Sequence, residues 1–334
     1  MNKSRWLIAL VLMLVCGALL LLPDRDEKMQ YFRNEGFIFG TQYVIQYEAK
    51  EDLHTDIQAA LLAVDSSLSM FNSESLIARI NCNEPVQTNA DFEEVYAIAR
   101  EVSQLTHGAF DITVAPLVNA WGFGFTHKET VTDALIDSLL PLVGYRQVTL
   151  LNHCITKADE RMMLDASAVA KGFACDKVAK LLKGKGVRNL LVDIGGEVVA
   201  EGKNSKGEPW AVGITKPIDD VTGQTQELQE IIKTEKMCMA TSGNYRNFYY
   251  EGEQRRSHTI DPRTGYPVQH NLLSATVTAS SCGRADALAT ACMVLGAEEA
   301  LGMIEQTPDA ACYLIVADGE ENKVLKSKGF DGTK

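Results

Sequence analysis

The stretch LDASAVAKGFACDKVAKLLKGKGVRNLLVDIGGEV covers residues 164–198 and contains a helix pattern followed by a strand pattern. Apolar residues recur at helical spacing from Ala168 to Lys185, and two glycines at the end of this segment form a normal helix stop signal. Residues 189–194 are typical of a buried strand, and a pair of glycines follows them. The stretch therefore predicts a helix and a strand with polar residues at their junctions.

On both sides of this stretch, predicted helices and strands follow one another without a repeat. Helices are predicted at 53–68, 91–105, 132–142, 282–295 and 298–305, the third with Thr132 as its cap. Strands are predicted at 37–47, 147–151, 162–164, 198–200, 210–214, 228–233, 237–241, 273–278 and 311–316. Because the helices interrupt runs of strands, the predicted class is α+β, with mixed or antiparallel sheets and packed helices, and not a regular βαβ series.

The composition is that of a globular protein. The 334 residues allow two ordinary domains or one large one, and 46% of them are hydrophobic and 23% charged. The formal net charge of −12 argues against a nucleic-acid surface or a polybasic membrane arm, because both need clustered cations. It does not exclude a nucleotide ligand, since a few local cations, amides or a metal ion can hold phosphates.

The N-terminus has the pattern of a secretory signal or a short membrane anchor. Lys3 and Arg5 precede an uncharged run from Trp6 to Leu22, which is near the minimum length that spans the hydrocarbon of a bilayer. The basic residues before this run place the N-terminus inside the cell and the rest of the chain outside. We therefore expect a signal or anchor at 1–23 and a charged linker at 24–34.

The cysteines leave two questions open. Cys16 lies in the apolar run and suggests lipidation after signal cleavage, although Val15 is bulky for the processing enzyme and the run stays apolar afterwards. An uncleaved anchor, a lipidated cysteine and simple secretion all remain possible. Of the eight cysteines, seven lie beyond the run, and none forms a CxxC pair. Buried free thiols are the favoured interpretation, with one disulfide left open.

Two glycine-rich segments suggest a backbone that approaches a ligand. In GAFDITVAPLVNAWGFG (108–124), small residues stand beside aromatic ones, as they do next to a flat ligand. Glycine and phenylalanine in a loop more often serve packing, however. VDIGGE (192–197) permits close backbone approach, or forms a plain hairpin turn. It lacks the GxGxxG spacing of a dinucleotide site, and no helix follows it.

Two helices contain polar residues suited to phosphate and metal chemistry. Asp165 precedes a helix and would ordinarily cap it, while Lys171, near the first turn, is placed to meet a phosphate. Asp286 and Thr290 are four residues apart and share one helix face. Their oxygens suit Mg²⁺ but are too few to hold it without phosphate oxygens and water. The structural alternative is a solvated Asp beside a packing Thr.

His258 is the histidine that lies within a dense polar motif. It belongs to SHTIDPRTGYP (257–267), which follows the hydroxyl-rich turn TSGNYR (241–246). Ser257, Asp261 and Arg263 could set its protonation. A lone histidine is normally structural, so this motif alone decides nothing.

Taken together, seven motifs in order resemble the ApbE family, the FAD:protein FMN transferases. They are FGT, FDITVAPLVNAWGFG, LDASAVAKG, VDIGGE, TSGNYRN, SHTIDPRTGYP and ADALAT, and the resemblance runs from about Gly36 to Ala317. It implies one large T-fold-like catalytic unit at 35–334 in place of two domains. Family members are similar to this chain in bearing a signal or a lipid anchor.

The resemblance also implies a reaction and a set of site residues. Such enzymes bind FAD, use Mg²⁺, and join FMN through a phosphoester to a Thr or Ser hydroxyl of a target protein, releasing AMP. His258 matches the family histidine, which would act as base for that hydroxyl. The implied FAD contacts are Phe39, Phe71, Ala109, Phe110, Asp111, Asp165, Lys171 and Ile260. The implied metal contacts are Asp286, Thr290 and the carbonyls of Ala168 and Ala289.

Two positions depart from the commoner family pattern, and two other functions stay open. Phe39 stands where Met is common, and Phe71 stands where Tyr is common, so Phe71 can stack on a flavin but cannot donate a hydroxyl hydrogen bond. The same site would serve a Mg²⁺-dependent FAD pyrophosphatase that produces FMN and AMP. A non-enzymatic exported flavin-binding lipoprotein is the second alternative.

The partners and the location are also implied by the resemblance. The expected targets are exported flavoprotein subunits of ion-pumping redox complexes. The enzyme would be held at the outer face of the inner (cytoplasmic) membrane, on the periplasmic side, through its N-terminus. No nucleic-acid partner is expected.

Overall fold

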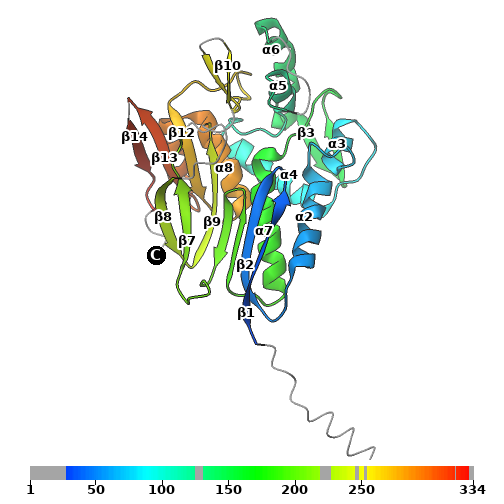
Figure 1. Ribbon diagram of the computed structural model, residues 1–334. Helices are drawn as coiled ribbons and strands as arrows, with labels where there is room; N and C mark the ends of the chain where they lie inside the picture. Colours follow the sequence, from blue (N-terminus) through cyan, green and yellow to red (C-terminus); the bar gives the residue numbers. More distant parts are fainter. Residues whose placement is uncertain are drawn as a thin grey trace, which may run out of the picture.

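An eight-stranded antiparallel sheet forms the framework of the protein. The computed structural model describes residues 28–124, 131–218, 227–244, 248–251, 254–319 and 321–330. Both ends of this described chain contribute to the sheet and form its two edges (Figure 1). In spatial order the strands are β1 (Gln30–Ile38), β2 (Thr41–Ala49), β5 (Leu190–Ile194), β6 (Glu197–Glu201), β9 (Lys236–Gly243), β12 (Leu272–Thr278), β13 (Ala311–Asp318) and β14 (Glu321–Lys326).

Helices cover one face of this sheet (Figure 1). They are α2 (His54–Leu68), α4 (Ala90–Leu105), α7 (Ser167–Gly184), α8 (Cys282–Leu295) and α9 (Ala297–Glu305). α7 contacts β5 and β6, whereas α8 contacts β9 and β12. α2 packs on α7 and α4 packs on α8, which adds a second helical layer. α8 is apolar around most of its circumference, and it is buried because it lies between α4 and the sheet.

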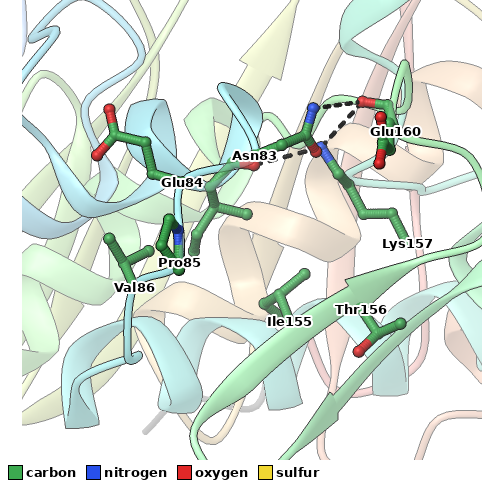
Figure 2. A pocket seen from close by; sticks show the side chains of 9 residues that line it. Asn83, Glu84, Pro85, Val86, Ile155, Thr156, Lys157 and Glu160 are labelled. Carbon is green, nitrogen blue, oxygen red and sulfur yellow. Dashed lines mark hydrogen bonds between the residues drawn. The ribbon is translucent and has the colours of Figure 1, made fainter.

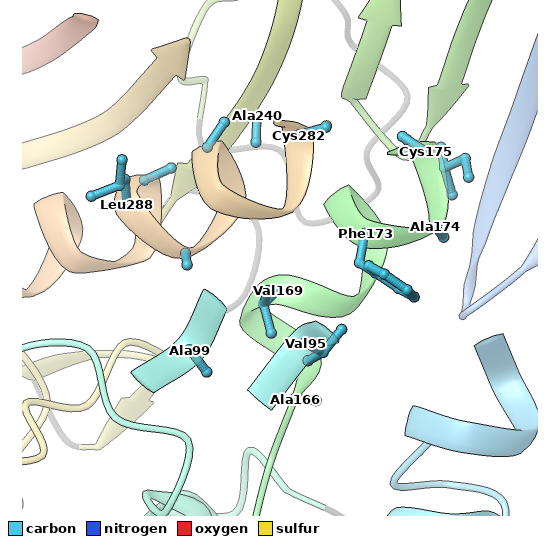
Figure 3. Close-up of a cluster of buried hydrophobic side chains, with 14 of the residues drawn as sticks. Val95, Ala99, Ala166, Val169, Phe173, Ala174, Cys175, Ala240, Cys282 and Leu288 are labelled. Atoms are coloured by element: carbon cyan, nitrogen blue, oxygen red, sulfur yellow. The ribbon is translucent and has the colours of Figure 1, made fainter. Parts of the chain in front are cut away.

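The main core lies between the helices and the sheet. Figure 3 shows Val95 and Ala99 of α4 facing Val169 and Phe173 of α7, with Leu288 of α8 beside them. All five side chains are buried. The many alanines on these helices keep the side chains short, so the helix axes can approach one another closely. This close approach brings the N-terminal half of α7 next to α8.

A hairpin covers part of the opposite face of the sheet. It consists of β7 (Trp210–Thr215) and β8 (Leu228–Thr234), which pair antiparallel. This second face has its own apolar clusters, so both faces of the central strands are buried. The clusters contain Val198, Val212, Met237 and Met239 in one case, and Ile214, Ala311, Tyr313, Ile315 and Phe330 in the other.

Short elements gather around one end of the sheet and helices. In Figure 1, α5, α6 and β10 lie together at the top of the view. The elements outside the two main layers are α3 (Leu76–Asn81), α5 (Ala115–Ala120), α6 (Asp133–Leu139), the 3-10 turns Leu140–Leu142 and Tyr145–Gln147, β3 (Val148–Leu151), β4 (Cys154–Lys157), β10 (Phe248–Glu251) and β11 (Gln254–Ser257). Several of these contain residues of the predicted site motifs.

The prediction of one continuous strand at 37–47 is wrong. The chain reverses at Phe39 and Gly40, whose φ angles are +51° and +73°, and β1 and β2 pair across this two-residue turn. Positive φ at both central residues is the geometry of a type I′ hairpin. The β-branched and aromatic composition of the segment predicts strand correctly but does not reveal the turn.

Two smaller predictions also need correction. No strand forms at 162–164, because the Asn81 side chain satisfies the backbone there: Leu164 donates to its Oδ1 at 2.7 Å and accepts from its Nδ2 at 2.9 Å. The predicted helix at 132–142 is divided into α6 and a 3-10 turn, although Thr132 caps it as expected. The Pro141 ring in that turn cannot continue a regular helix.

The α+β class is confirmed, and the N-terminal predictions lie mostly outside the described residues. The expected signal or anchor at 1–23 falls outside them entirely. The last residues of the expected linker, from Gln30 to Asn34, are part of β1, so that linker ends earlier than predicted. Across the residues that the structure covers, no helix has the length and apolar character needed to cross a bilayer.

Candidate active site

The start of α7 joins two of the predicted motifs. Asp165 lies just before the helix, and its Oδ1 accepts the backbone N–H of Ser167 at 2.8 Å. The backbone N–H of Asp165 donates to the carbonyl of Ile112 at 2.6 Å. Asp165 does not occupy the N-cap position, which belongs to Ala166, but its carboxylate accepts the first N–H of the helix from one position before it. The same residue attaches the LDASAVAKG motif to the segment around Phe110.

Lys171 on the second turn of α7 forms an ion pair with Glu197, the first residue of β6. The Nζ–Oε1 distance is 2.7 Å, and the Glu197 side chain is only 1% exposed. Burial alone would lower the pKa of Lys171, but the nearby carboxylates of Glu197 and Asp286 outweigh it and raise this pKa. Burial raises the pKa of Glu197, and the neighbouring Lys171 ammonium group opposes this shift.

Asp286 and Thr290 project from α8 toward the same end of α7. Asp286 is 3% exposed, and its Oδ2 accepts the backbone N–H of Gly172 at 3.1 Å. A Cβ atom at Gly172 would lie 2.3 Å from the Cys282 carbonyl oxygen and 2.9 Å from the Asp286 Cβ. Only a glycine therefore lets α7 approach α8 this closely. The Thr290 hydroxyl contacts the Ser242 hydroxyl at 3.2 Å, which adds β9 to the cluster.

The residues at this junction fit a hard divalent cation. The four predicted ligand positions offer one carboxylate, one hydroxyl and two backbone carbonyls, all of them oxygen donors, as Mg²⁺ prefers. The Gly172 N–H, which in a regular helix bonds the Ala168 carbonyl, donates to the Asp286 carboxylate. Burial raises the pKa of Asp286, while Lys171 and that N–H oppose the shift. Two buried carboxylates beside one ammonium group leave a negative charge that a cation would compensate.

That donor set is incomplete on its own. Within the described ranges, no group of three or more His, Cys, Asp or Glu side chains is placed to hold a metal ion. A cation at Asp286 would therefore need oxygens from another source. Phosphate groups of a bound ligand and water molecules provide such oxygens, so the geometry favours a metal that binds together with a phosphate ligand.

In the Phe110–Asp111 segment, the side chains serve the fold of the loop, so the backbone is the part that is available for a ligand contact. Ala109 and Phe110 are buried, and the Asp111 carboxylate is occupied within the protein. Its Oδ1 accepts the N–H and hydroxyl of Thr113 at 2.8 and 2.6 Å, and its Oδ2 accepts the N–H of Tyr145 at 2.7 Å. Burial raises the pKa of Asp111, and these hydrogen bonds oppose the shift. The carboxylate thus fixes the shape of the loop.

The two predicted aromatic contacts differ in exposure. Phe71 is 78% exposed, so its ring is available for stacking on a flat ligand. Asn81 connects the Met70–Phe71 turn to the start of the LDASAVAKG motif, since its Nδ2 contacts both the Met70 sulfur and the Leu164 carbonyl. Phe39 is partly buried in the β1–β2 turn. That turn lies beside the paired glycines, because Gly195 donates to the Gln42 carbonyl at 3.0 Å.

His258 lies on the segment that connects β11 to the turn of the SHTIDPRTGYP motif. Its ring meets the Phe123 ring edge-on, with 6.3 Å between the centroids. The next residue, Thr259, donates to Asn244 at 2.6 Å, and Asn244 directly follows β9. Since Ser242 of β9 contacts Thr290, these contacts direct the His258 segment toward the α8 cluster.

Two neighbours of His258 have other partners. Asp261 is held by a bidentate pair with Arg263, at 2.9 and 2.8 Å. Ile260 is 5% exposed and packs with Leu117 and Trp121, so a ligand contact from this position would come from its backbone. The end of the TSGNYRN motif, from Tyr245 to Asn247, lies outside the described residues.

A cavity elsewhere in the structure does not coincide with these motifs. It has a volume of about 290 Å³ and lies between α3 and β4 (Figure 2). Lys157 in its wall donates to the carbonyls of Ile80, Glu160 and Met162 at 2.9 to 3.2 Å, so this ammonium group serves the fold. None of the residues lining this cavity is a predicted site residue.

The sequence analysis did not assign a role to three residues that the structure places at the site. Glu197 and Ser242 belong to quoted motifs, but their long-range partners Lys171 and Thr290 are visible only in the fold. Asn81 belongs to no motif. The one sequence signal for Glu197 is an acidic residue within the otherwise buried GGEVVA segment. The seven described cysteines are all free thiols and four of them are buried, as expected of mostly buried thiols, whereas Cys82 and Cys154 are exposed.

The fold, an antiparallel sheet covered by helices on one face, is that of the flavin transferases. The chain belongs to the ApbE family, whose model matches residues 39–314. Among curated proteins, it is similar to the FAD:protein FMN transferase of Haemophilus influenzae, with 37% identity over 84% of this chain and 85% of the relative. The enzyme of the same name from Escherichia coli K12 is 33% identical over 86% of this chain and 83% of the relative.

Solved structures agree with this assignment. The flavin transferase ApbE from Vibrio cholerae superposes with a TM-score of 0.82 at 33% identity, covering 92% of this chain and all of that structure. The ApbE protein from Thermotoga maritima has a TM-score of 0.79 at 25% identity, covering 91% of this chain and 99% of the other.

Proposed function

We propose that this protein is a Mg²⁺-dependent FAD:protein FMN transferase. The observation that supports it most directly is the junction of α7 and α8, where Lys171, Asp286 and Thr290 converge within the ApbE fold. A pyrophosphate ligand needs positive charge and a metal ion bound by oxygen atoms, and this junction has an ammonium group and oxygen donors for such an ion. The relatives described above have the same activity in their names.

The reaction joins FMN to a Thr or Ser hydroxyl of a target protein. His258 accepts the proton of that hydroxyl, and the hydroxyl oxygen forms a bond to the flavin-side phosphorus. The bond from this phosphorus to the oxygen of the AMP phosphate breaks, and AMP leaves. Lys171 supplies positive charge to the phosphate oxygens at the start of α7. Mg²⁺ bound at Asp286, Thr290 and the carbonyls of Ala168 and Ala289 would neutralise charge on the pyrophosphate and the departing AMP.

Flavin binding is assigned to the rim of this junction. The Phe71 ring stacks on the flavin, with Phe39 at the β1–β2 turn beside it. The backbones of Ala109, Phe110 and Ile260 contribute contacts, because their side chains are buried. The targets are exported flavoprotein subunits of ion-pumping redox complexes. The apolar N-terminal run holds the enzyme on the periplasmic side of the cytoplasmic membrane, as an anchor or through Cys16.

A labelling experiment tests this function. The full-length chain in mild detergent is incubated with FAD, Mg²⁺ and an exported flavoprotein domain that has a Thr or Ser acceptor. We expect covalent yellow fluorescence on the target in a denaturing gel, and none with Asp286→Ala. Free FMN and AMP without a labelled target would identify a pyrophosphatase instead. Flavin binding that needs no metal and yields no product would identify a non-enzymatic flavin carrier.

A further inference from the structure

Glu197 is a buried carboxylate whose presence is not explained by stability. Its side chain is 1% exposed, and Oε1 accepts from Lys171 while Oε2 has no hydrogen-bond partner among the described residues. An unpaired buried polar atom destabilises the folded state, because it loses its hydrogen bonds to water. Buried ion pairs are often no more stable than apolar pairs of the same volume. The pair therefore calls for a role other than holding the fold together.

The two members of the pair differ in mobility. Glu197 is fixed by the sheet, because it pairs with Ile194 across the β5–β6 turn and its carbonyl accepts from the Cys175 thiol at 3.1 Å. The Lys171 side chain is 31% exposed and has a flexible four-carbon stem. Glu197 thus lies on the protein side of Lys171, whose side chain stays partly exposed.

We propose that Glu197 is a positioning residue that fixes the Lys171 ammonium group for the transition state, at the expense of resting affinity for FAD. This inference rests on the proposed function. A carboxylate at 2.7 Å restricts Lys171 to one geometry and offsets part of the attraction of its ammonium group for the pyrophosphate of a bound ligand. Binding that is equally strong in the ground state and the transition state does not raise the turnover rate. Glu197 therefore shifts the contribution of Lys171 from binding toward catalysis.

The chain offers a matched control pair. Lys183 and Glu201 also join α7 to β6, at the same Nζ–Oε1 distance of 2.7 Å, but their side chains are 46% and 27% exposed. Glu201→Gln removes the same charge from the same strand, four residues from Glu197. Because exposed pairs contribute little, we expect FAD affinity and FMN transfer to stay within about twofold of the wild type.

The test compares Glu197→Gln with that control in the full-length protein. FAD affinity is measured by flavin fluorescence in the absence of target, and FMN transfer by target labelling at saturating FAD. We expect Glu197→Gln to bind FAD about threefold more tightly and to transfer FMN at least about tenfold more slowly. In a Lys171→Met background, Glu197→Gln should change neither quantity, because its effect passes through Lys171.

Other outcomes would overturn the proposal. A Glu197→Gln variant that transfers FMN at the wild-type rate would contradict it. A variant in which FAD affinity, FMN transfer and Tm all fall together would also contradict it, because that result indicates a purely structural role. If the wild type labels no target, the proposed function fails. The FAD affinities of the wild type, Glu197→Gln, Lys171→Met and the double variant still show in that case whether Glu197 acts through Lys171. If Glu197→Gln does not fold, Glu197→Asp retains the charge one methylene away and should slow transfer with little change in FAD affinity. Wild-type transfer by that variant would contradict the proposal.

Discussion

Phe39 has a backbone conformation that few aromatic residues adopt. Its φ of +51° lies in the left-handed region, which costs a non-glycine residue about 1–2 kcal/mol. The hairpin pairing of β1 with β2 and the adjacent Gly195–Gln42 hydrogen bond hold it there. The FGT motif marks this position in the sequence, but the sequence does not reveal that the ring direction is set by a strained turn.

Replacing His258 should separate catalysis from binding. In His258→Ala, we expect FMN transfer to fall by about 10²–10⁴-fold, because the target hydroxyl loses its base, while FAD affinity changes little. Target labelling and flavin fluorescence measure the two effects. His153→Ala is the control, since His153 is an exposed histidine on the β3–β4 turn. Its side chain contacts that of Glu93 at 2.7 Å. A loss of FAD binding in His258→Ala would make His258 a ligand contact.

At the level of elements, α7 and α8 are fixed to each other by an aspartate. Asp176 on α7 accepts the backbone N–H groups of Cys282 and Gly283 at 2.9 and 2.8 Å, so it caps α8 from outside that helix. Both N–H groups would otherwise lack an intrahelical partner. This cap sets the position of α8 along α7, and hence the position of Asp286 relative to Gly172.

The Asp176 cap predicts a pH dependence of stability. Burial raises the pKa of Asp176 to about 6, so the folded state holds its proton more tightly than the unfolded state does. The resulting stabilisation is complete at low pH and is lost as the pH rises from about 4 to about 6, by roughly 3 kcal/mol.

Urea unfolding of the wild type and Asp176→Asn at several pH values measures this effect. The stability advantage of the wild type should shrink over that range and stay constant above it. Asp137→Asn, on the exposed side of α6, should leave the curve unchanged. A wild-type advantage that grows with pH would mean that Asp176 is stabilised in its charged form.

Long periodic elements could be predicted from the sequence, and short or long-range ones could not. The pattern predicts α8 at its observed bounds and α7 to within one residue, because both have buried faces and clear end signals. The helices α3 and α5 are too short to show a period. The false strand at 162–164 depends on the side chain of Asn81, which is distant in sequence.

At the scale of the whole molecule, strand order is the part of the fold that the sequence does not contain. Tyr43 of β2 pairs with Ile194 of β5, and only the folded chain brings these strands together. The seven motifs predict a shared site because they occur in the family order, not because of their spacing. Their contacts, such as Lys171 with Glu197, follow from the sheet and helix packing.

Ligand binding should stabilise the whole protein in a metal-dependent way. If FAD and Mg²⁺ bind at the junction of α7, α8 and β9, as proposed, together they should raise Tm by a few degrees more than the sum of their separate effects. Differential scanning fluorimetry with FAD, Mg²⁺, both, or both plus EDTA measures this coupling. Asp286→Ala should lose the Mg²⁺-dependent part alone. Strictly additive shifts in the wild type would argue against a shared site.

The β1 strand also acts as a spacer. The described chain begins at Lys28, shortly before the first residue of β1, Gln30, and the last residue of β1 adjoins the Phe39 turn. Nine residues of extended strand separate the two ends by roughly 30 Å. If the chain is held at a surface through its N-terminus, as proposed, the whole of β1 lies along the chain between the attached end and the Phe39 turn, and this length would leave room for a folded partner to approach.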